Sequence, residues 1–235
     1  MTTRNRGKQS SDDRDFAVKW HPIFTEAIND LCFLLTRGYA ENSALQIVGN
    51  RYKLNKRQRN AVLRVSAGDH EIENRNKSVC NPKNLKNKVV EIDGFNLLIL
   101  LESALSGAFI FKGRDGLYRD ISSVHGSYKR VVKTESAILL VGKLLEDLEV
   151  QSVKWYLDQP VSNSGRLKTK LLEVSESYGY NWEVELVFDP DKVLVKSKNI
   201  VVSSDGWILD HVEKWFNLGG FIIENNIKES NIIIV

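Results

Sequence analysis

Hydrophobic and polar residues are arranged in two different ways along the chain, and the change comes near residue 89. Beyond this point, short apolar runs rich in branched residues alternate with longer stretches of helical spacing. The short runs predict β-strands, at residues 89–92, 153–157, 184–188, 200–204 and 232–235. The stretch FIFKGRDGLYRDI predicts a β-hairpin that turns at Arg114, Asp115 and Gly116.

Helical spacing fills the segments between these strands. The predicted helices are residues 96–106, 134–149, 164–178 and 207–216. Alternating strands and helices are typical of a parallel sheet that is covered on both faces and built with right-handed crossovers. We therefore predict an α/β fold for residues 89–235, with a mainly parallel sheet flanked by helices.

The N-terminal part of the chain is predicted to be helical. Apolar residues recur at helical spacing between Pro22 and Gly38. The stretch ENSALQIVGNRYKLNKRQRNAVLRVSAG predicts two short helices with a tight connection, which is the outline of a helix-turn-helix. We therefore predict a disordered tail, a small basic all-helical domain, a linker and the α/β domain, at residues 1–15, 16–68, 69–88 and 89–235.

The two halves of the chain differ in charge. Residues 1–88 hold 17 Lys and Arg against 9 Asp and Glu, a net charge of +8, whereas residues 89–235 hold 16 against 21, a net charge of −5. A basic part beside an acidic part suits an anionic partner such as nucleic acid. The second helix of the predicted helix-turn-helix carries basic residues suited to phosphate contact: Lys56, Arg57, Arg59 and Arg64. An ordinary solvated helix face explains these residues equally well.

The composition narrows the class of protein. The hydrophobic fraction of 42% and the charged fraction of 27% fit a soluble globular protein. Cys32 and Cys80 lie far apart, which argues against a thiolate zinc site and a disulfide framework. The first residues lack the apolar segment of a signal peptide, and no apolar run approaches the roughly 20 residues that span a bilayer. We therefore expect a cytoplasmic protein that makes no membrane contact.

Three common chemistries lack their motifs. The sequence has no GxxxxGK[ST] for a P-loop and no GxGxxG after the first strand for a dinucleotide. It also has no GxSxG nucleophile elbow. Nucleotide-driven, redox and serine-hydrolase functions are therefore poorly supported.

Acidic residues stand where the predicted strands end. The acids at or soon after a strand end are Asp93, Asp158, Asp189, Asp191, Asp205 and Asp210. Ligands of an open parallel sheet bind at the carboxyl ends of its strands, so these acids converge if the strands are neighbours. Clustered carboxylates need a cation, and hard oxygen ligands suit Mg²⁺ or Mn²⁺. Helix capping is the competing explanation for each single acid.

Polar residues accompany the acids at the same predicted edge. They are Asn96, Ser162, Asn163, Ser203 and Ser204. Their repetition across several strands favours a site over independent helix caps. A divalent cation held there would activate water and stabilise the charge that develops on a phosphodiester during cleavage.

Two motifs carry a resemblance to a known superfamily. IDGFN after the first strand and VVSSDGWILD late in the chain resemble the PIN-like nucleases, and the NYN branch most closely. Together with the basic helical N-terminus, the chain also resembles an uncharacterised, mainly archaeal family of two-part proteins. The nuclease resemblance implies metal ligands that are also catalytic: Asp93, Asp158, Asp205 and Asp210. It also implies that Asn96 and Ser204 position the site.

The same resemblance leaves one part of the site unassigned. PIN-like nucleases often place an acid in the helical region between the first and middle strands. Two candidates stand there, Glu102 in an apolar helix and Glu135 at a helix start. The sequence does not choose between them.

The stretch LDQPVSNSGRLK predicts a phosphate site beside the acids. Small polar residues that open a helix present free backbone N–H groups to an anion, and two basic side chains follow. The candidates are Ser162, Asn163, Ser164, Arg166 and Lys168. An ordinary loop with Asn163 or Ser164 as the helix N-cap explains the stretch equally well. His125 in RDISSVHGSYKR is a further candidate for phosphate binding or proton transfer.

The sequence thus favours a nuclease that uses Mg²⁺ or Mn²⁺ and acts on nucleic acid, RNA above DNA. Two alternatives stay open. A Toprim-like enzyme would use Glu91 with Asp189 and Asp191. A non-catalytic protein would bind nucleic acid or a nucleotide on a degenerate nuclease fold. Assembly into a homo-oligomer is compatible with each of these functions.

Overall fold

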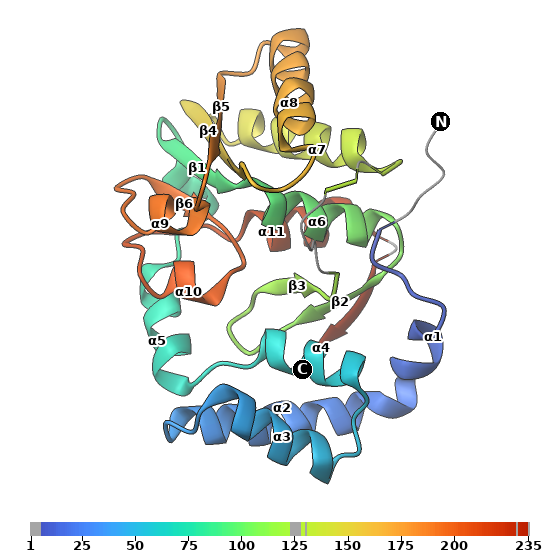
Figure 1. Cartoon of the computed structure of the whole chain (residues 1–235). Helices are drawn as coiled ribbons and strands as arrows, with labels where there is room; N and C mark the ends of the chain where they lie inside the picture. Colours follow the sequence, from blue (N-terminus) through green and yellow to red (C-terminus); the bar gives the residue numbers. More distant parts are fainter. Residues whose placement is uncertain (1–5, 123–127, 130, 229, 235) are drawn as a thin grey trace.

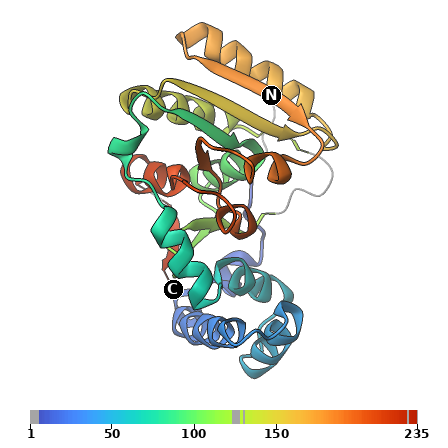
Figure 2. The ribbon, with the colours of Figure 1, turned by 90° about the vertical axis from the view of Figure 1, so that its left-hand side faces the viewer.

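The computed structural model describes residues 6–122, 128, 129, 131–228 and 230–234. Its main sheet has four parallel strands in the order β5-β4-β1-β6. These are β1 (Val89–Asp93), β4 (Ser152–Asp158), β5 (Trp182–Val187) and β6 (Ile200–Val202). All four strands point the same way, so their carboxyl ends lie together at one edge of the sheet, on the right in Figure 2.

Four long helices cover one face of this sheet and two short ones lie on the other (Figure 1). The long helices are α6 (Gly94–Leu105), α7 (Thr134–Asp147), α8 (Ser164–Tyr178) and α11 (Leu218–Asn226). The short ones are α9 (Pro190–Leu194) and α10 (Gly206–Leu209). The prediction of an α/β fold with a parallel sheet flanked by helices is confirmed.

A second, smaller sheet has the order β3-β2-β7. The predicted hairpin is confirmed as antiparallel strands β2 (Phe109–Lys112) and β3 (Tyr118–Asp120). The last strand, β7 (Asn231–Ile234), pairs in parallel with β2 rather than joining the main sheet.

The N-terminal helices pack against this smaller sheet (Figures 1 and 2). The elements before the linker region are α1 (Asp12–Asp15), the 3₁₀ helix η1 (Val18–Trp20), α2 (His21–Thr36), α3 (Glu41–Arg51) and α4 (Lys56–Val65). Their apolar side chains share one core with Phe111 of β2, Ile121 and Ile233 of β7. The helical part therefore shares its core with strands from the second half of the chain.

Two segments near the N-terminus are more structured than predicted. Residues 69–88, predicted as a linker, form helix α5 (Asp69–Ser78) and the 3₁₀ helix η2 (Pro82–Leu85). Periodicity could not reveal α5 because its one buried residue is Arg75, which is held by ion pairs. The described part of the predicted tail is also ordered, since Arg57 pairs with Asp12 and Arg6 pairs with Glu102.

The predicted helix 207–216 ends early. Helix α10 stops at Leu209, and a turn and an irregular segment follow, in which Trp215 bridges to Val201 and Val79. Helix α11 follows, begun by Asn217, whose side chain accepts a hydrogen bond from the backbone N–H of Gly220. No helix in the described part of the chain is long and apolar enough to cross a membrane.

Candidate functional site

Four carboxylates lie at the carboxyl ends of the main-sheet strands, and we call Asp93, Asp158, Asp191 and Asp205 the acidic edge. Asp93 and Asp158 are the last residues of β1 and β4, Asp191 stands in the first turn of α9 after β5, and Asp205 caps α10 after β6. Every strand of the sheet thus contributes one acid. The sequence predicted that these acids converge if their strands are neighbours, and β1 does lie between β4 and β6 in the sheet.

Asp93 is the buried member of the acidic edge, with 7% of its surface exposed. One carboxylate oxygen accepts a hydrogen bond from the backbone N–H of Asn96 at 3.4 Å, and the other accepts from Ser203 Oγ at 2.8 Å. Burial raises the pKa of Asp93 to about 7, and the charges of Asp191 and Asp205 push it the same way. Asp93 therefore caps helix α6, as the competing explanation proposed. It is also a buried carboxyl group whose negative charge is disfavoured by the neighbouring acids.

Asp191 has the second strongly raised pKa. Burial raises it to about 6, with further contributions from Asp205, Asp158 and Asp189. Burial also raises the pKa of Asp158. Asp189 differs, because a hydrogen bond from Lys192 holds its pKa below the usual value and the two side chains form a salt bridge at 2.9 Å. Asp191 is therefore the acid that belongs to this group, and Asp189 is already neutralised.

The raised pKa of Asp93 predicts a pH-dependent stability. The folded protein holds this proton to about pH 7, whereas the unfolded chain releases it near 3.8. Asp93 therefore lowers the stability of the metal-free protein progressively as pH rises between these values. We expect Asp93→Asn to stabilise the protein at pH 8 by on the order of 2–4 kcal/mol, and by less at pH 5. Urea unfolding in EDTA measures the free energy of unfolding of the wild type and the variant at both pH values. A difference between the two proteins that does not change with pH would contradict the raised pKa of Asp93.

A loop between β6 and α10 is fixed against helix α6. The Asn96 side-chain oxygen accepts hydrogen bonds from the backbone N–H of Ser204 at 3.0 Å and from its hydroxyl at 2.6 Å. Ser203 Oγ accepts from the backbone N–H of Asp205 at 3.0 Å while it donates to Asp93. The two motifs that were far apart in sequence thus meet, and Asn96 positions the loop that carries Asp205.

The glycine in each motif permits a close approach. A Cβ on Gly94 would lie 2.6 Å from Leu157 and 3.0 Å from the carbonyl oxygen of Tyr156. A Cβ on Gly206 would lie 2.6 Å from the guanidinium of Arg75. Each Asp-Gly pair therefore combines an acid at a strand end with a helix start that packs directly on its neighbours.

Asp210 does not belong to the acidic edge, which corrects the sequence prediction. Arg75 binds both of its carboxylate oxygens, at 2.7 and 2.8 Å. The same guanidinium pairs at 2.8 Å with Asp115, which also pairs with Arg119, and Arg119 Nε donates at 3.0 Å to the carbonyl oxygen of Ser204. This network was missed because its members come from α5, the hairpin and the α10 region, and nothing local in the sequence connects them.

The other acids considered from the sequence lie away from this edge. Glu102 is fully buried and accepts hydrogen bonds from Arg6, Tyr128 and Thr134. Glu135 pairs with Lys170 at 3.2 Å. Neither supplies the middle acid expected of a PIN-like site.

Glu91, the first acid of the Toprim-like alternative, lies two residues before Asp93 on β1. It accepts a hydrogen bond from Asn199 at 2.9 Å, at the beginning of β6. Its side chain thus contacts the residue before β6, whereas Asp189 and Asp191 follow the end of β5.

The acidic edge is not a formed metal cluster. Within residues 6–122, 128, 129, 131–228 and 230–234, no three His, Cys, Asp or Glu side chains are close enough together to hold a metal ion. The carboxylates therefore interact over longer range, through charge, in the arrangement seen. A bound cation would have to draw the carboxylates of the acidic edge closer together.

The predicted phosphate loop is partly occupied by its own contacts. Ser164 is buried, and its hydroxyl donates to the carbonyl oxygen of Gln159 at 3.3 Å, so it does not face a ligand. Asn163 has a left-handed backbone and its side chain donates to the carbonyl oxygen of Tyr128, so it is not the side-chain cap of α8.

The remaining candidates for phosphate binding differ in their exposure to solvent. Ser162 and Arg166 are exposed and Lys168 is half-buried, around the first turn of α8. His125 lies outside the described residues.

Two basic residues of α4 have structural partners. Arg57 pairs with the fully buried Asp12, at 2.8 Å through one nitrogen. Arg59 donates to the carbonyl oxygen of Leu54 at 2.8 Å and packs over Gly49. Their predicted role as free phosphate contacts is therefore corrected, since both help to fix the helices to their surroundings.

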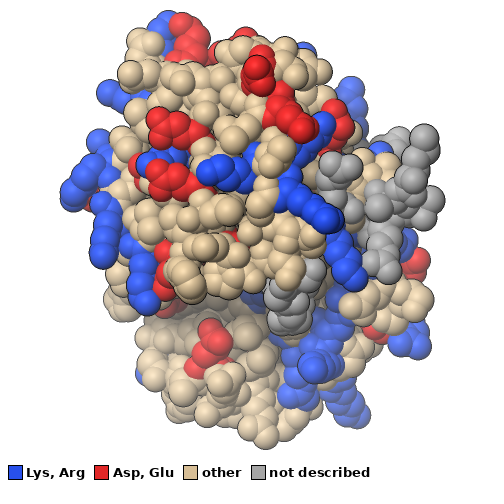
Figure 3. Space-filling view, turned by 45° about the horizontal axis from the view of Figure 1, so that its top comes forward, with Lys and Arg blue, Asp and Glu red and all other residues tan. Residues whose placement is uncertain are grey.

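All four predicted docking residues nevertheless line one open groove. It has a volume of about 980 Å³ and is lined by Gln9, Leu45, Lys56, Arg57, Arg59, Asn60, Arg64 and Ile121. Arg64 is only weakly paired, 3.8 Å from Asp120, and its buried Nε has no hydrogen-bond partner among the described residues. Lys and Arg side chains also gather on the helical part at the lower right of the face in Figure 3. We call this cavity the basic groove.

Comparisons with known proteins agree with a two-part chain. Residues 82–221 match a family described as a domain of unknown function, DUF5616, and residues 23–77 match a protein family of unknown function, DUF434. A protein of Methanocaldococcus jannaschii, described as uncharacterised, is 36% identical over 184 residues, which cover 78% of this chain and 88% of that protein. No solved structure matches the chain. The chain therefore belongs to the DUF5616 family, with a DUF434 region before the family domain.

Proposed function

We propose that the chain is a PIN-like, metal-dependent nuclease that hydrolyses phosphodiester bonds, RNA above DNA, at the acidic edge. The observation that carries the proposal is the burial of Asp93 against the charges of Asp191 and Asp205. None of the four acids of the acidic edge forms a salt bridge with a described residue, whereas the neighbouring Asp189 pairs with Lys192. Unneutralised carboxylates at the carboxyl ends of parallel strands are costly unless a cation joins them.

The donor set fits Mg²⁺ or Mn²⁺. Both cations prefer carboxylate and hydroxyl oxygens and keep waters that a substrate phosphate can replace. Asp93, Asp191 and Asp205 would hold the cation, and Asp158 stands at the neighbouring strand end. When bound, such a cation supplies an activated water and stabilises charge on the phosphate. Asn96 and Ser203 keep the two acid-bearing loops in place.

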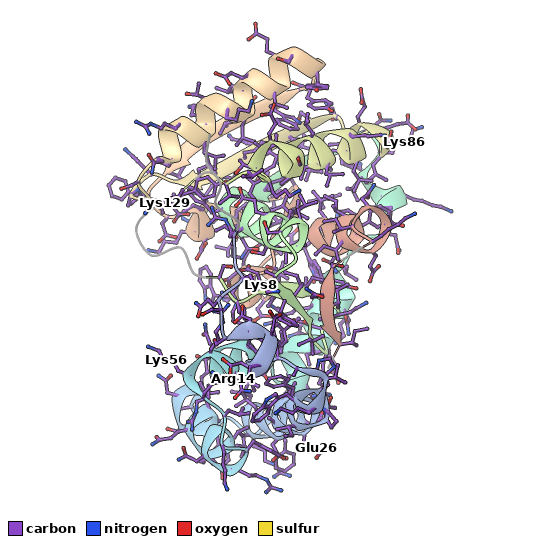
Figure 4. All side chains as sticks on the ribbon, turned by 90° about the vertical axis from the view of Figure 1, so that its right-hand side faces the viewer. Lys8, Arg14, Glu26, Lys56, Lys86 and Lys129 are labelled. Atoms are coloured by element: carbon purple, nitrogen blue, oxygen red, sulfur yellow. The ribbon has the colours of Figure 1, made fainter. Side chains whose placement is uncertain are left out.

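The basic groove is the proposed docking surface for the nucleic acid. Figure 4 shows Lys56 and Lys129 pointing to the same side of the molecule. The residue before Lys129 is hydrogen-bonded to the loop after β4, through its N–H and the carbonyl oxygen of Ser162 at 3.0 Å. A strand bound in the groove and passing Lys129 would thus come to the loop that follows Asp158.

The experiment that tests the nuclease proposal is a cleavage assay. Purified protein is incubated with end-labelled single-stranded RNA, structured RNA and DNA, with Mn²⁺, Mg²⁺ or EDTA. Cleavage that requires a divalent cation and favours RNA is the expected result. No cleavage of any substrate, with binding retained, would replace the nuclease by a non-catalytic nucleic-acid-binding protein, the function favoured by the lack of a formed metal cluster among the described residues.

The docking surface predicts a separate effect on affinity. Lys56 and Asn60 are exposed, and Lys56 is the first residue of α4, where an acid suits the helix dipole. We expect Lys56→Glu with Asn60→Asp to weaken RNA binding about tenfold at low salt and to reduce the salt slope by about one. Fluorescence anisotropy across a salt series measures both. The exposed Lys143→Glu on α7 is the matched control, and equal affinities for the two variants would remove the groove from the proposal.

A further inference from the structure

A second cavity opens at the other end of the main sheet. It has a volume of about 570 Å³ and is lined by Lys77, Ser78, Val79, Cys80, Asn84, Lys88, Val89, Lys198, Asn199, Ile200, Glu213 and Lys214. Val89 and Ile200 begin β1 and β6, so the cavity lies at the amino ends of the two strands whose carboxyl ends carry Asp93 and Asp205. It is therefore distinct from the acidic edge and from the basic groove, and we call it the lysine pocket.

The charge of the lysine pocket is strongly one-sided. Four lysines and one glutamate line it, and Glu213 pairs with Lys198. The other three lysines, Lys77, Lys88 and Lys214, form no salt bridge with any residue in the described ranges. Cationic side chains from α5, from the residue before β1 and from the segment after α10 thus line one cavity, and such a lining favours an anionic ligand.

The walls of the lysine pocket are partly apolar. Ile200 is 5% exposed, and Val79 is 41% exposed although it is a branched apolar residue. Cys80, next to Val79, has a half-buried thiol. Burial raises the pKa of this thiol, and the charge of Lys214 offsets part of the increase. Apolar walls under a cationic rim suit a ligand with an uncharged flat body and a charged end.

We propose that the lysine pocket binds a nucleoside phosphate, with its phosphates among Lys77, Lys88 and Lys214 and its base against Val79 and Ile200. The proposal does not depend on nuclease activity, because it uses none of the acidic-edge residues. A bound ligand would touch the first residues of β1 and β6, the same strands that position Asp93 and Asp205. The pocket is thus placed to report nucleotide levels to the opposite edge.

The reactivity of the Cys80 thiol measures whether a ligand occupies the lysine pocket. The sequence has two cysteines, and Cys32 is fully buried in the helical core, so a thiol reagent added to the folded protein reports on Cys80. The rate of Cys80 modification by dithionitrobenzoate is measured with ADP, with adenosine, and with sodium chloride at matched ionic strength. At about ten times its dissociation constant, ADP is expected to slow the reaction about tenfold. Adenosine and salt are expected to leave it within twofold.

The variant Lys77→Ala with Lys214→Ala is expected to lose this protection, while Lys143→Ala on α7 keeps it. Comparing each variant with and without ADP cancels the direct effect of Lys214 on the thiol. Circular dichroism checks that the variants fold; both substituted lysines are exposed. The proposal is overturned if 10 mM ADP protects Cys80 less than twofold, or protects the double variant as well as the wild type.

Discussion

Asp93→Asn is expected to abolish Mn²⁺-dependent RNA cleavage, by at least about 100-fold in rate, while the protein remains folded. Asp93 is the buried carboxylate of the acidic edge, held between the backbone of Asn96 and the hydroxyl of Ser203. Asparagine keeps the size and one oxygen acceptor but removes the charge that the cation requires. The same substitution stabilises the metal-free protein, so activity and stability change in opposite directions.

Two other aspartates give the matched controls for this loss. Asp189 stands at the same edge but pairs with Lys192, so Asp189→Asn is expected to reduce cleavage less than tenfold. Asp147 is exposed at the end of α7, and Asp147→Asn is expected to change nothing. Initial rates on one labelled RNA, with Mn²⁺ varied, compare all three variants. An Asp93→Asn enzyme as active as Asp147→Asn would show that the acidic edge is not the catalytic site.

Mn²⁺ should also raise the thermal midpoint of the wild type and not that of Asp93→Asn. This second measurement distinguishes a variant that no longer binds Mn²⁺ from one that binds Mn²⁺ but no longer cleaves RNA. Stabilisation of both proteins to the same extent would place the cation elsewhere.

The strand-end acids could be predicted because the pattern is local. A branched apolar run, an acid, a glycine and a helix start occupy only a few residues at Asp93 and again at Asp205. Strand direction then places such residues at one edge of the sheet whatever the intervening chain does. The pairing of Asn96 with Ser204 followed from that edge, once β1 and β6 proved to be neighbours.

The role of Asp210 could not be predicted because its partner is remote. Arg75 lies 135 residues earlier in a helix that is polar on nearly every face, so neither hydrophobic spacing nor a motif marks it. The same holds for α4, where the charge of Arg57 indicated a free cation and the fold supplied Asp12. Charge in a sequence shows what a residue can bind, and the fold decides whether the partner is internal.

Asp115→Ala is expected to cost about 3–5 kcal/mol of unfolding free energy, the largest stability effect of any substitution considered. Its side chain is 1% exposed and holds the guanidinium groups of both Arg75 and Arg119, so its removal leaves two buried cations short of a counter-charge. Burial acts to raise the pKa of Asp115, but the two arginines outweigh it and keep that pKa below the usual value. A lowered pKa means that the network stabilises fully at neutral pH and weakens only in acid.

A second aspartate of the same region gives the control for Asp115. Asp69 pairs with Arg114 at 3.1 Å, but both side chains are exposed, so Asp69→Ala is expected to cost no more than about 1 kcal/mol. Urea unfolding at pH 7 measures both variants. Because Arg119 also holds the carbonyl oxygen of Ser204, Asp115→Ala should weaken Mn²⁺ stabilisation as well, whereas Asp69→Ala should not. Equal unfolding costs for the two variants would contradict the stabilising role of the buried network, and equal Mn²⁺ stabilisation would mean that the network does not fix the loop that carries Asp205.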